Sequence, residues 1–470
     1  MNKAIFQLDA LTFLRRGSAW VAMLLIMATI FYVGWNGDSW RDARAAELQS
    51  FEAEKLGELA QWRQTMEEIE RGELSPTPFD GNPMSILFPA VLPPAPLSDF
   101  AIGHSDIQPQ SAEVSAWRNP ANLFGHYQFE NPATLAVGGL DLTLVIVLLM
   151  PILMIAISFD VLAADRSRGT LPMMMSFPLR LASVAWPRLL LRNGILWFTA
   201  VVAMFVLLVV NDSGGERYAH FGIWLAVCLA YGAFWLSLIA LSVSAIRSAV
   251  GTAAALIGAW AVLTLAVPAM ISTGSESLYP TPSRLAWLSE VREAQGETNR
   301  ELDRLTEGFL MDHPDLTVSE EQVPSYFRGS FLANEAARQR TAPILAGYEK
   351  ARSDRQHIVD LAQYLSPAVI AQRLLHVAAG ADLGRQHSYQ SQARESLSTL
   401  AETIGPAVIS RNRISMAEFE ELQPFQFKEK STAELVNSAL WPLLYLLLLS
   451  ALLSYFAQRR LATSQPEPGA

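Results

Sequence analysis

Histidine is the side chain of this sequence with the widest choice of chemistry, because it can bind metals and transfer protons. Seven histidines occur, at positions 104, 126, 220, 313, 357, 376 and 387. Neutral imidazole suits copper, zinc or nickel, so a metal site is one interpretation of this set. The spacing does not favour it, since His376 and His387 are eleven residues apart, which is no ligand spacing on one helix face. We expect surface or hydrogen-bonded histidines and keep a metal site as the alternative.

Three consecutive methionines, Met173–Met175, form a second candidate, since thioethers bind soft metals. No histidine or cysteine lies near them in the sequence. Methionine is also the most adaptable apolar side chain at protein contacts. We therefore favour packing of this run against a partner protein.

Motifs for nucleotide binding and hydrolysis are absent from the sequence. There is no G-x-x-x-x-G-K-[ST], no G-x-G-x-x-G after a strand, no H-E-x-x-H and no G-x-S-x-G. Cys228 is the single cysteine, which excludes an intramolecular disulfide and a cysteine-based zinc site. We expect neither an enzyme nor a bound cofactor in this chain.

The composition indicates a membrane protein. Hydrophobic residues make up 51% of the chain and charged residues only 17%, against about 25% in soluble domains. The apolar residues gather in six blocks, each near the roughly 20 residues that a helix needs to cross a bilayer. We place the spans at 18–35, 138–159, 189–210, 220–242, 249–271 and 438–456, with Pro151 and Pro442 expected to kink the second and sixth.

Basic residues in the short connections set the expected orientation. They lie before span 1, between spans 2 and 3, between spans 4 and 5, and after span 6: Lys3, Arg15, Arg16, Arg166, Arg168, Arg180, Arg188, Arg247, Arg459 and Arg460. All fall on one side if both termini are cytoplasmic. We therefore expect a multi-pass protein of the bacterial inner membrane, with a cytoplasmic segment 1–17, a cytoplasmic loop 160–188 and a cytoplasmic tail 457–470.

Two long segments then lie on the periplasmic side, 36–137 between spans 1 and 2 and 272–437 between spans 5 and 6. The first carries 6 basic and 15 acidic residues and the second 17 and 23, so the rest of the chain is at +5 while the whole is at −10. The acidic balance belongs to these insertions, which makes nucleic acid an improbable partner.

Both insertions are predicted to be mainly helical, within an all-α membrane protein. Ser39 to Asp42 resembles a capping box that starts a helix of about 30 residues ending near Gly72, and the proline-rich stretch after it should be extended or irregular. In the second insertion we expect helices at 283–311, 331–365, 367–379 and 382–404, with Pro343 kinking or splitting the second.

The short stretch 165–180, "DRSRGTLPMMMSFPLR", combines arginines with an apolar centre. Thr170 could cap a short helix with Pro172 in its first turn. Leu171 and Met173–Met175 would offer an apolar knob and the flanking arginines a charged rim. A bundle without a nucleotide site or a charged pathway needs energy from another protein. Residues 165–180 could be the element on which a separate ATPase acts. Composition alone leaves open a plain loop lying on the lipid headgroups.

Residues 131–193 resemble the permeases of ABC type-2 exporters, in which an acidic residue, Gly-Thr-Leu and Ser-x-Pro follow the second span. The matching positions are Asp165, Gly169, Thr170, Leu171, Ser176 and Pro178, and Arg188 replaces the family's later lysine. The resemblance implies a coupling helix that contacts a separate ATPase subunit, which would bind ATP and Mg. The predicted coupling set is Asp165, Arg168, Gly169, Thr170, Leu171, Pro172, Met174, Ser176 and Pro178.

Residues 365–397 look like the large exterior domain of one permease subgroup, related to permeases for multi-copper enzyme maturation. Ser366, Pro367, Gly380, Asp382 and His387 match its pattern, and residues 424–427 match its closing motif. The resemblance implies a half-transporter that pairs with a second permease copy or a sister permease and with two cytoplasmic ABC ATPases. It also implies an amphipathic elbow helix at residues 3–14.

The expected function is therefore export or extraction of a substrate by an ATP-driven permease subunit. The alternative is an ATP-driven mechanotransmission or assembly scaffold, including metalloenzyme maturation, which acts on a periplasmic protein while nothing crosses the bilayer.

Overall fold

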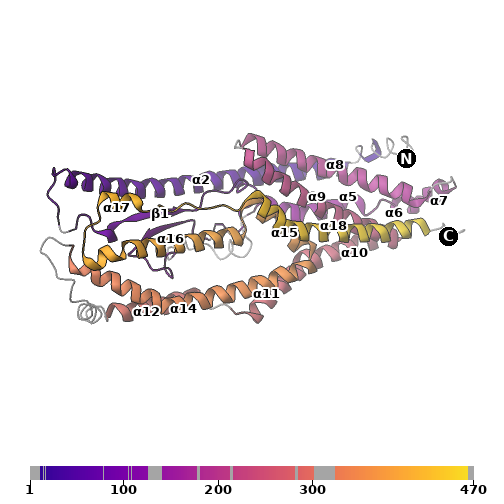
Figure 1. Cartoon of the computed structure of the whole chain (residues 1–470). Helices are drawn as coiled ribbons and strands as arrows, with labels where there is room; N and C mark the ends of the chain where they lie inside the picture. The colour runs from indigo at the N-terminus through magenta and orange to yellow at the C-terminus, as the bar shows by residue number, and fades with distance from the viewer. Residues whose placement is uncertain are drawn as a thin grey trace.

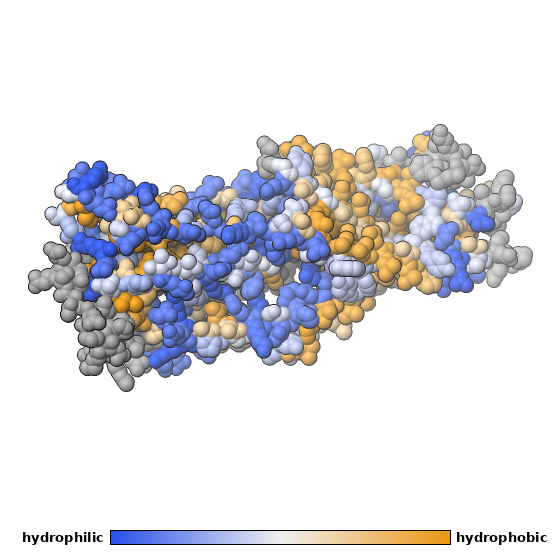
Figure 2. All heavy atoms as spheres, in the orientation of Figure 1, coloured by the Kyte–Doolittle hydropathy of each residue, from blue (hydrophilic) through white to orange (hydrophobic). Residues whose placement is uncertain are grey.

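The protein is elongated, with a helical bundle at one end and a polar domain at the other (Figure 1). The computed structural model describes residues 11–463 except 14, 16, 78, 104, 107, 125–139, 177–179, 212–214, 281–283 and 301–322. Apolar side chains gather over the bundle and hydrophilic ones over the polar domain (Figure 2). Helix is the dominant structure of the described residues.

Within the described residues, six helical stretches are long and apolar enough to span a membrane, which confirms the predicted multi-pass membrane protein. Their bounds are Gly17–Glu70, Leu142–Ser167, Leu181–Val210, Gly215–Ala245, Ala249–Leu278 and Thr432–Thr463. In Figure 1 these are α2, α4 to α6, α8, α9, α10 to α11, and α18. The start of α2, the end of α18 and the connection between the second and third spans lie at one end of the bundle, which we call the loop end (Figure 1). The polar domain lies at the other end.

The first span continues without a break into the polar domain as α2 (Gly17–Glu70). At 1.5 Å per residue its 54 residues reach about 80 Å. The predicted break after residue 35 and new start at Ser39 are wrong. The Ser39 hydroxyl donates to the Trp35 carbonyl oxygen at 2.9 Å, inside the helix, and does not cap one.

Glycines on α2 serve close packing. A Cβ on Gly34 would lie 2.3 Å from Leu207 Cδ1 of α8 (Leu181–Val210), and one on Gly37 would lie 2.0 Å from the Asp99 carbonyl oxygen. The absence of a side chain at these two positions therefore lets α2 approach its neighbours closely. A glycine in a helix pattern can mark such an approach as easily as it marks an end.

The polar domain joins α2 to four further helices and a small sheet. The helices are α12 (Arg284–Arg300), α14 (Ser325–Ala362), α16 (Leu383–Ser410) and α17 (Met416–Glu421). Strand β1 (Leu87–Val91), after the 3-10 turn η1 (Pro83–Ser85), pairs antiparallel with β2 (Ser111–Ser115), so that Leu87 faces Ser115. The prediction of an all-α protein needs correction, because the first insertion contains this two-stranded sheet. It lies in the proline-rich stretch that was expected to be extended or irregular and in the region after it. Its core includes Phe88, Val114 and Leu397.

The helices of the second insertion differ from the prediction at their ends. Helix α14 begins at Ser325 and passes Pro343 without dividing, and α16 runs through Pro406 to Ser410. Helix α15 (Pro367–Ala379) has the predicted bounds, since Ser366 accepts from the backbone of its first turn and Gly380, at φ 74°, ends it in the left-handed region. Its apolar side chains, however, belong to the core of the bundle and not to that of the polar domain.

Two spans contain a wide π turn shortly before a proline. These turns are η2 (Val145–Leu149) before Pro151 and η3 (Val262–Ala266) before Pro268. A proline has no N–H to donate, and its ring clashes with the carbonyl four residues earlier, so a wide turn relieves the helix there.

Side chains from other elements satisfy the carbonyl groups at these turns. The Tyr231 hydroxyl of α9 (Gly215–Ala245) donates to the Val147 oxygen at 3.0 Å, and the Trp260 indole N–H donates to the Leu148 oxygen at 3.2 Å. The Ser366 hydroxyl donates to the Leu263 oxygen in η3. The wide turns thus become points of attachment between helices.

Candidate functional sites at the two ends of the bundle

The loop predicted at residues 160–188 ends earlier, because α8 begins at Leu181, and we call residues 160–180 the coupling loop. It contains two short helices at the loop end. Helix α6 (Ala163–Ser167) and helix α7 (Thr170–Met175) meet at Gly169, whose φ of 68° lies in the left-handed region. A Cβ there would touch nothing, so the need for glycine comes from the backbone turn and not from space. The short helix predicted between spans 2 and 3 is thus present, and it projects from the bundle (Figure 1).

The Asp165 carboxylate holds this loop through two contacts. One carboxylate oxygen forms an ion pair with Arg188 of α8, and the other accepts from the Thr170 hydroxyl at 3.1 Å. The Asp165 and Arg188 side chains are only 18% and 13% exposed, so the pair is shielded from solvent. Thr170 therefore acts as a donor to Asp165 and not as an acceptor that caps α7. The sequence pointed to Asp165 and Arg188 separately, and the fold brings them together.

Arg166 bonds the same loop to the connection between spans 4 and 5. Its guanidinium donates to the carbonyl oxygens of Ile246 and Arg247 at 3.3 and 3.4 Å. These two residues connect α9 to α10 (Ala249–Ala261). The base of α7 is thus bonded to the connection between spans 4 and 5 as well as to span 3.

The tip of the loop is exposed. Met173 is 65% exposed, and Arg168 and Ser176 are exposed as well. Leu171 and Met174 are half-buried, and Leu171 packs against the bundle core. Pro172 lies in α7, and Pro178 lies outside the described residues. A fixed base with an exposed apolar tip is the geometry of a docking element.

Charged and polar side chains that the sequence placed near span ends are paired across spans. Arg192 donates to Asp160 at 2.8 Å, and the Asn193 amide donates to the Ser158 hydroxyl at 2.9 Å. Asp141 caps α4 (Leu142–Leu144) by accepting from the Leu144 N–H. The Arg192–Asp160 and Asn193–Ser158 bonds join spans 2 and 3 next to the coupling loop, whereas the Asp141 cap lies at the other end of span 2.

Phe13, at the end of the predicted elbow helix, packs against the bundle. It is buried in the bundle core and lies under the Arg192 guanidinium, 5.7 Å from ring centroid to Cζ. Most of the predicted element, residues 3–10 and 14, lies outside the described residues.

A cavity of about 1330 Å³ lies at the opposite end of the bundle, and we call it the polar cavity. Residues of α14, α15, α16 and α9 line it, together with the return segment 427–431 and the start of α18 (Thr432–Thr463). Its charged lining residues are Glu216, Glu349, Arg352, Asp360, Arg373, Asp382, Arg385, Glu429, Lys430 and Glu434.

Every histidine that the structure describes lines the polar cavity: His220, His357, His376 and His387. His220 Nδ1 donates to the Ala378 carbonyl oxygen at 2.8 Å. Among the described residues, no group of three or more His, Cys, Asp or Glu is arranged to hold a metal ion. The other three histidines, 104, 126 and 313, lie outside those residues. The gathering of the four in one cavity had no signal in the sequence, because their spacing follows no single helix face.

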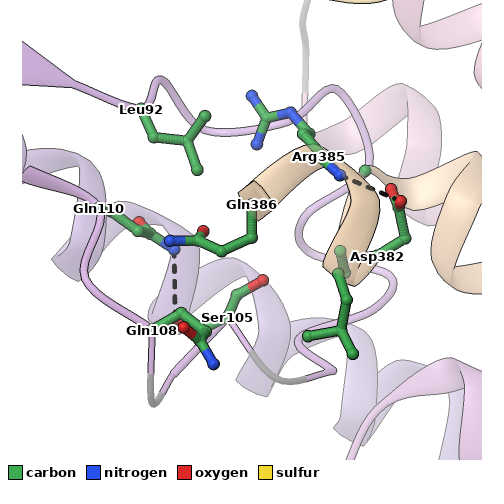
Figure 3. Close-up of a pocket in the computed structure, with 10 residues that line it drawn as sticks. Leu92, Ser105, Gln108, Gln110, Asp382, Arg385 and Gln386 are labelled. Atoms are coloured by element: carbon green, nitrogen blue, oxygen red, sulfur yellow. Dashed lines mark hydrogen bonds between the residues drawn. The ribbon is translucent and has the colours of Figure 1, made fainter. Parts of the chain in front are cut away.

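A second cavity, of about 20 Å³, adjoins the polar cavity across Gly380–Arg385 (Figure 3). Asp382 caps α16 by accepting from the Arg385 N–H at 3.1 Å, and the Gln110 amide donates to the Ser105 carbonyl oxygen at 3.3 Å. Burial raises the pKa of the Asp382 carboxyl, and the Arg385 N–H opposes this rise. The space suffices for little more than a water molecule, so this is a structural joint.

Comparison with known proteins gives one match. A family model described as a domain of unknown function (DUF3526) matches residues 284–428, which comprise α12, α14, α15, α16 and α17. No curated protein matches the chain. No solved structure matches it either.

Proposed function

We propose that this protein is the transmembrane permease subunit of an ATP-driven ABC exporter of the bacterial inner membrane. A separate cytoplasmic ATPase would bind ATP and Mg and dock on α7, and a second permease copy or a sister permease would complete the transporter. The observation that carries the proposal is the coupling loop, whose exposed tip stands on a base bonded to span 3 and to the connection between spans 4 and 5.

The bonding pattern supports transmission of force. Asp165 connects α6 to α8 through Arg188, and Arg166 connects it to the segment that precedes α10. A displacement of α7 would therefore move the loop-end portions of spans 2, 3 and 5 together. A loop lying on headgroups would not need bonds both to span 3 and to the connection between spans 4 and 5.

Docking can be tested on the tip of the loop. We expect the double variant Arg168→Glu and Met174→Asp to abolish co-purification of an ATPase, because it reverses a rim charge and places a carboxylate in an apolar contact. Loss of a central contact costs about 2 kcal/mol or more, which is close to thirtyfold in affinity. The measurement is the amount of ATPase recovered with the purified chain.

Arg459→Glu is the matched control, since Arg459 is an exposed arginine at the same end of the bundle. It should leave the recovery unchanged if the loss is specific to the coupling loop. Equal recovery of ATPase with the double variant and with the unmodified chain would count heavily against docking at α7.

A mechanotransmission or assembly scaffold is the second candidate, and the unbroken helix α2 favours it. A single helix of 54 residues connects the loop end of the bundle to the far part of the polar domain, so it could pass a movement on to a periplasmic protein. Inverted membrane vesicles separate the two functions: ATP-dependent accumulation of a cargo inside them removes the scaffold, whereas ATP hydrolysis that moves the polar domain without any uptake supports it.

A further inference from the structure

The start of helix α15 lies inside the bundle, away from the polar-domain end. At its start, the Ser366 hydroxyl donates to the Leu263 oxygen in η3, and the Tyr445 hydroxyl of α18 donates to the Tyr364 oxygen at 2.9 Å. Leu263 lies eight residues before the end of the apolar block 249–271, and Tyr445 lies seven residues after the start of the block 438–456. Both spacings place the turn η4 (Gln363–Leu365) about 10 to 12 Å below the polar-domain end of the bundle.

The other end of α15 lies at that boundary. Ala378 accepts from His220, which is the first residue of the apolar block 220–242. The segment from α14 through η4 to α15 thus enters the bundle and leaves it on the same side. Irregular backbone at membrane depth must be buried in protein or line a wet cavity. In η4, Gln363 is buried and lines the polar cavity, whereas Leu365 is 68% exposed.

The two faces of α15 separate two environments. One face is buried in the bundle core and consists of Pro367, Ala368, Ile370, Ala371, Leu374, Leu375, Ala378 and Ala379. The other face lines the polar cavity and consists of Val369, Gln372, Arg373, His376 and Val377. Positions on the second face follow the spacing of three and four residues that marks one side of a helix. Helix α15 is therefore the wall between the polar cavity and the interior of the bundle.

The Ser366 hydroxyl holds α15 in place by accepting and donating hydrogen bonds. Its hydroxyl oxygen accepts from the Ala368 and Val369 N–H groups at 3.2 and 3.4 Å, which caps α15, and its hydrogen goes to the Leu263 oxygen. That oxygen needs a partner because Pro268, five residues later, has no N–H with which to complete a π turn. A proline in span 5 thereby creates the acceptor that fixes α15.

We propose that η4 and α15 form a re-entrant gate, closed in this structure, whose latch is the hydrogen bond between Ser366 and Leu263. The role of this gate in export rests on the proposed function. Arg166 of the coupling loop bonds to the residues just before α10, and α10 leads directly into η3. Movement of α7 would shift η3 along its axis, release Ser366 and let α15 withdraw toward the polar cavity.

Accessibility to a membrane-impermeant maleimide tests the gate in the full-length chain in nanodiscs. In a Cys228→Ala background, cysteines are placed singly at Ala371, on the bundle face of α15, at Gln372, on the cavity face, and at Ala200, inside the bundle on α8. We expect rapid labelling at position 372 and slow labelling at positions 371 and 200. Adding Ser366→Ala should accelerate labelling at position 371 about tenfold, while position 200 stays slow.

Ser366→Thr keeps the hydroxyl and should restore slow labelling at position 371. Equal acceleration at positions 371 and 200 would mean general loosening of the bundle and would overturn the gate, as would no acceleration at position 371. A second arm adds the co-purified ATPase: labelling at position 371 should rise during ATP hydrolysis, and an unchanged rate in a preparation that hydrolyses ATP would overturn the gate as well. If no ATPase is recovered, the proposed function fails, whereas the Ser366 arm still decides whether α15 is a latched, movable wall.

Discussion

Replacing Asp165 by alanine is expected to detach the coupling loop from the third span and to eliminate ATPase docking, because the Asp165 carboxylate holds the loop through Arg188 and Thr170. The change leaves the Arg188 guanidinium, only 13% exposed, without its carboxylate, and it also removes the acceptor of the Thr170 hydroxyl. Stranding one member of a shielded charge pair costs about 2 to 5 kcal/mol. Thermal stability of the purified chain and recovery of the ATPase should fall together.

Two further variants show whether the ion pair is responsible. Thr170→Val removes one hydroxyl and should cost about 1 kcal/mol, well below the cost of the Asp165 variant. The exchange Asp165→Arg with Arg188→Asp re-forms the pair in reverse and should recover part of both losses. An Asp165→Ala chain with unchanged stability and full ATPase recovery would show that the pair does not fix the loop.

Gly37→Ala is expected to have the second large effect, this time on assembly of the bundle. The new Cβ would lie 2.0 Å from the Asp99 carbonyl oxygen, and a backbone atom cannot move aside as a side chain can. Asp99 is itself held by a buried ion pair with Arg217 and accepts from the Asn211 amide at 3.3 Å. Overpacking of this kind costs about 3 kcal/mol or more, so we expect a marked fall in thermal stability and in folded yield.

Other glycines of α2 provide graded controls within the same helix. Gly34→Ala meets Leu207 Cδ1, the end of a flexible side chain, and should cost less than Gly37→Ala. Gly57→Ala meets nothing within 4 Å and should stabilise α2 by about 0.5 to 1 kcal/mol. If all three substitutions had the same effect on thermal stability, helix propensity and not close packing would explain the result.

The spans were predictable because long apolar blocks have few alternatives to crossing a membrane, whereas the joints between elements were not. Ser39 to Asp42 matches a helix start, yet the residues on either side are also compatible with helix. The helix therefore continues through them, and α2 packs on α8 as one unbroken element. The helical pattern of 367–379 predicts the bounds of α15 but not its location, since an amphipathic face fits any apolar partner.

The candidate sites divide in the same way. The types and order of Asp165, Gly169 and Thr170 pointed to a functional loop, because a resemblance can be read residue by residue. The bonds from Asp165 to Arg188 and from Arg166 to Ile246 join residues 23 and 80 positions apart. Such pairings depend on how the spans pack, and no local spacing predicts them. The polar cavity is built from four separate stretches of chain, 93–96, 216–220, 349–388 and 427–438, for the same reason.

The central claim is that the coupling loop faces the cytoplasm as a handle for an ATPase, and side-specific labelling at Ser176 tests it most directly. Ser176 is exposed next to α7, and Cys228→Ala removes the single native thiol. Ala60, exposed on α2 in the polar domain, serves as the reciprocal position. We predict that an impermeant thiol reagent labels Ser176→Cys in inverted membrane vesicles and Ala60→Cys in spheroplasts. Labelling of Ser176→Cys from outside intact spheroplasts would contradict the orientation and, with it, the proposed export function.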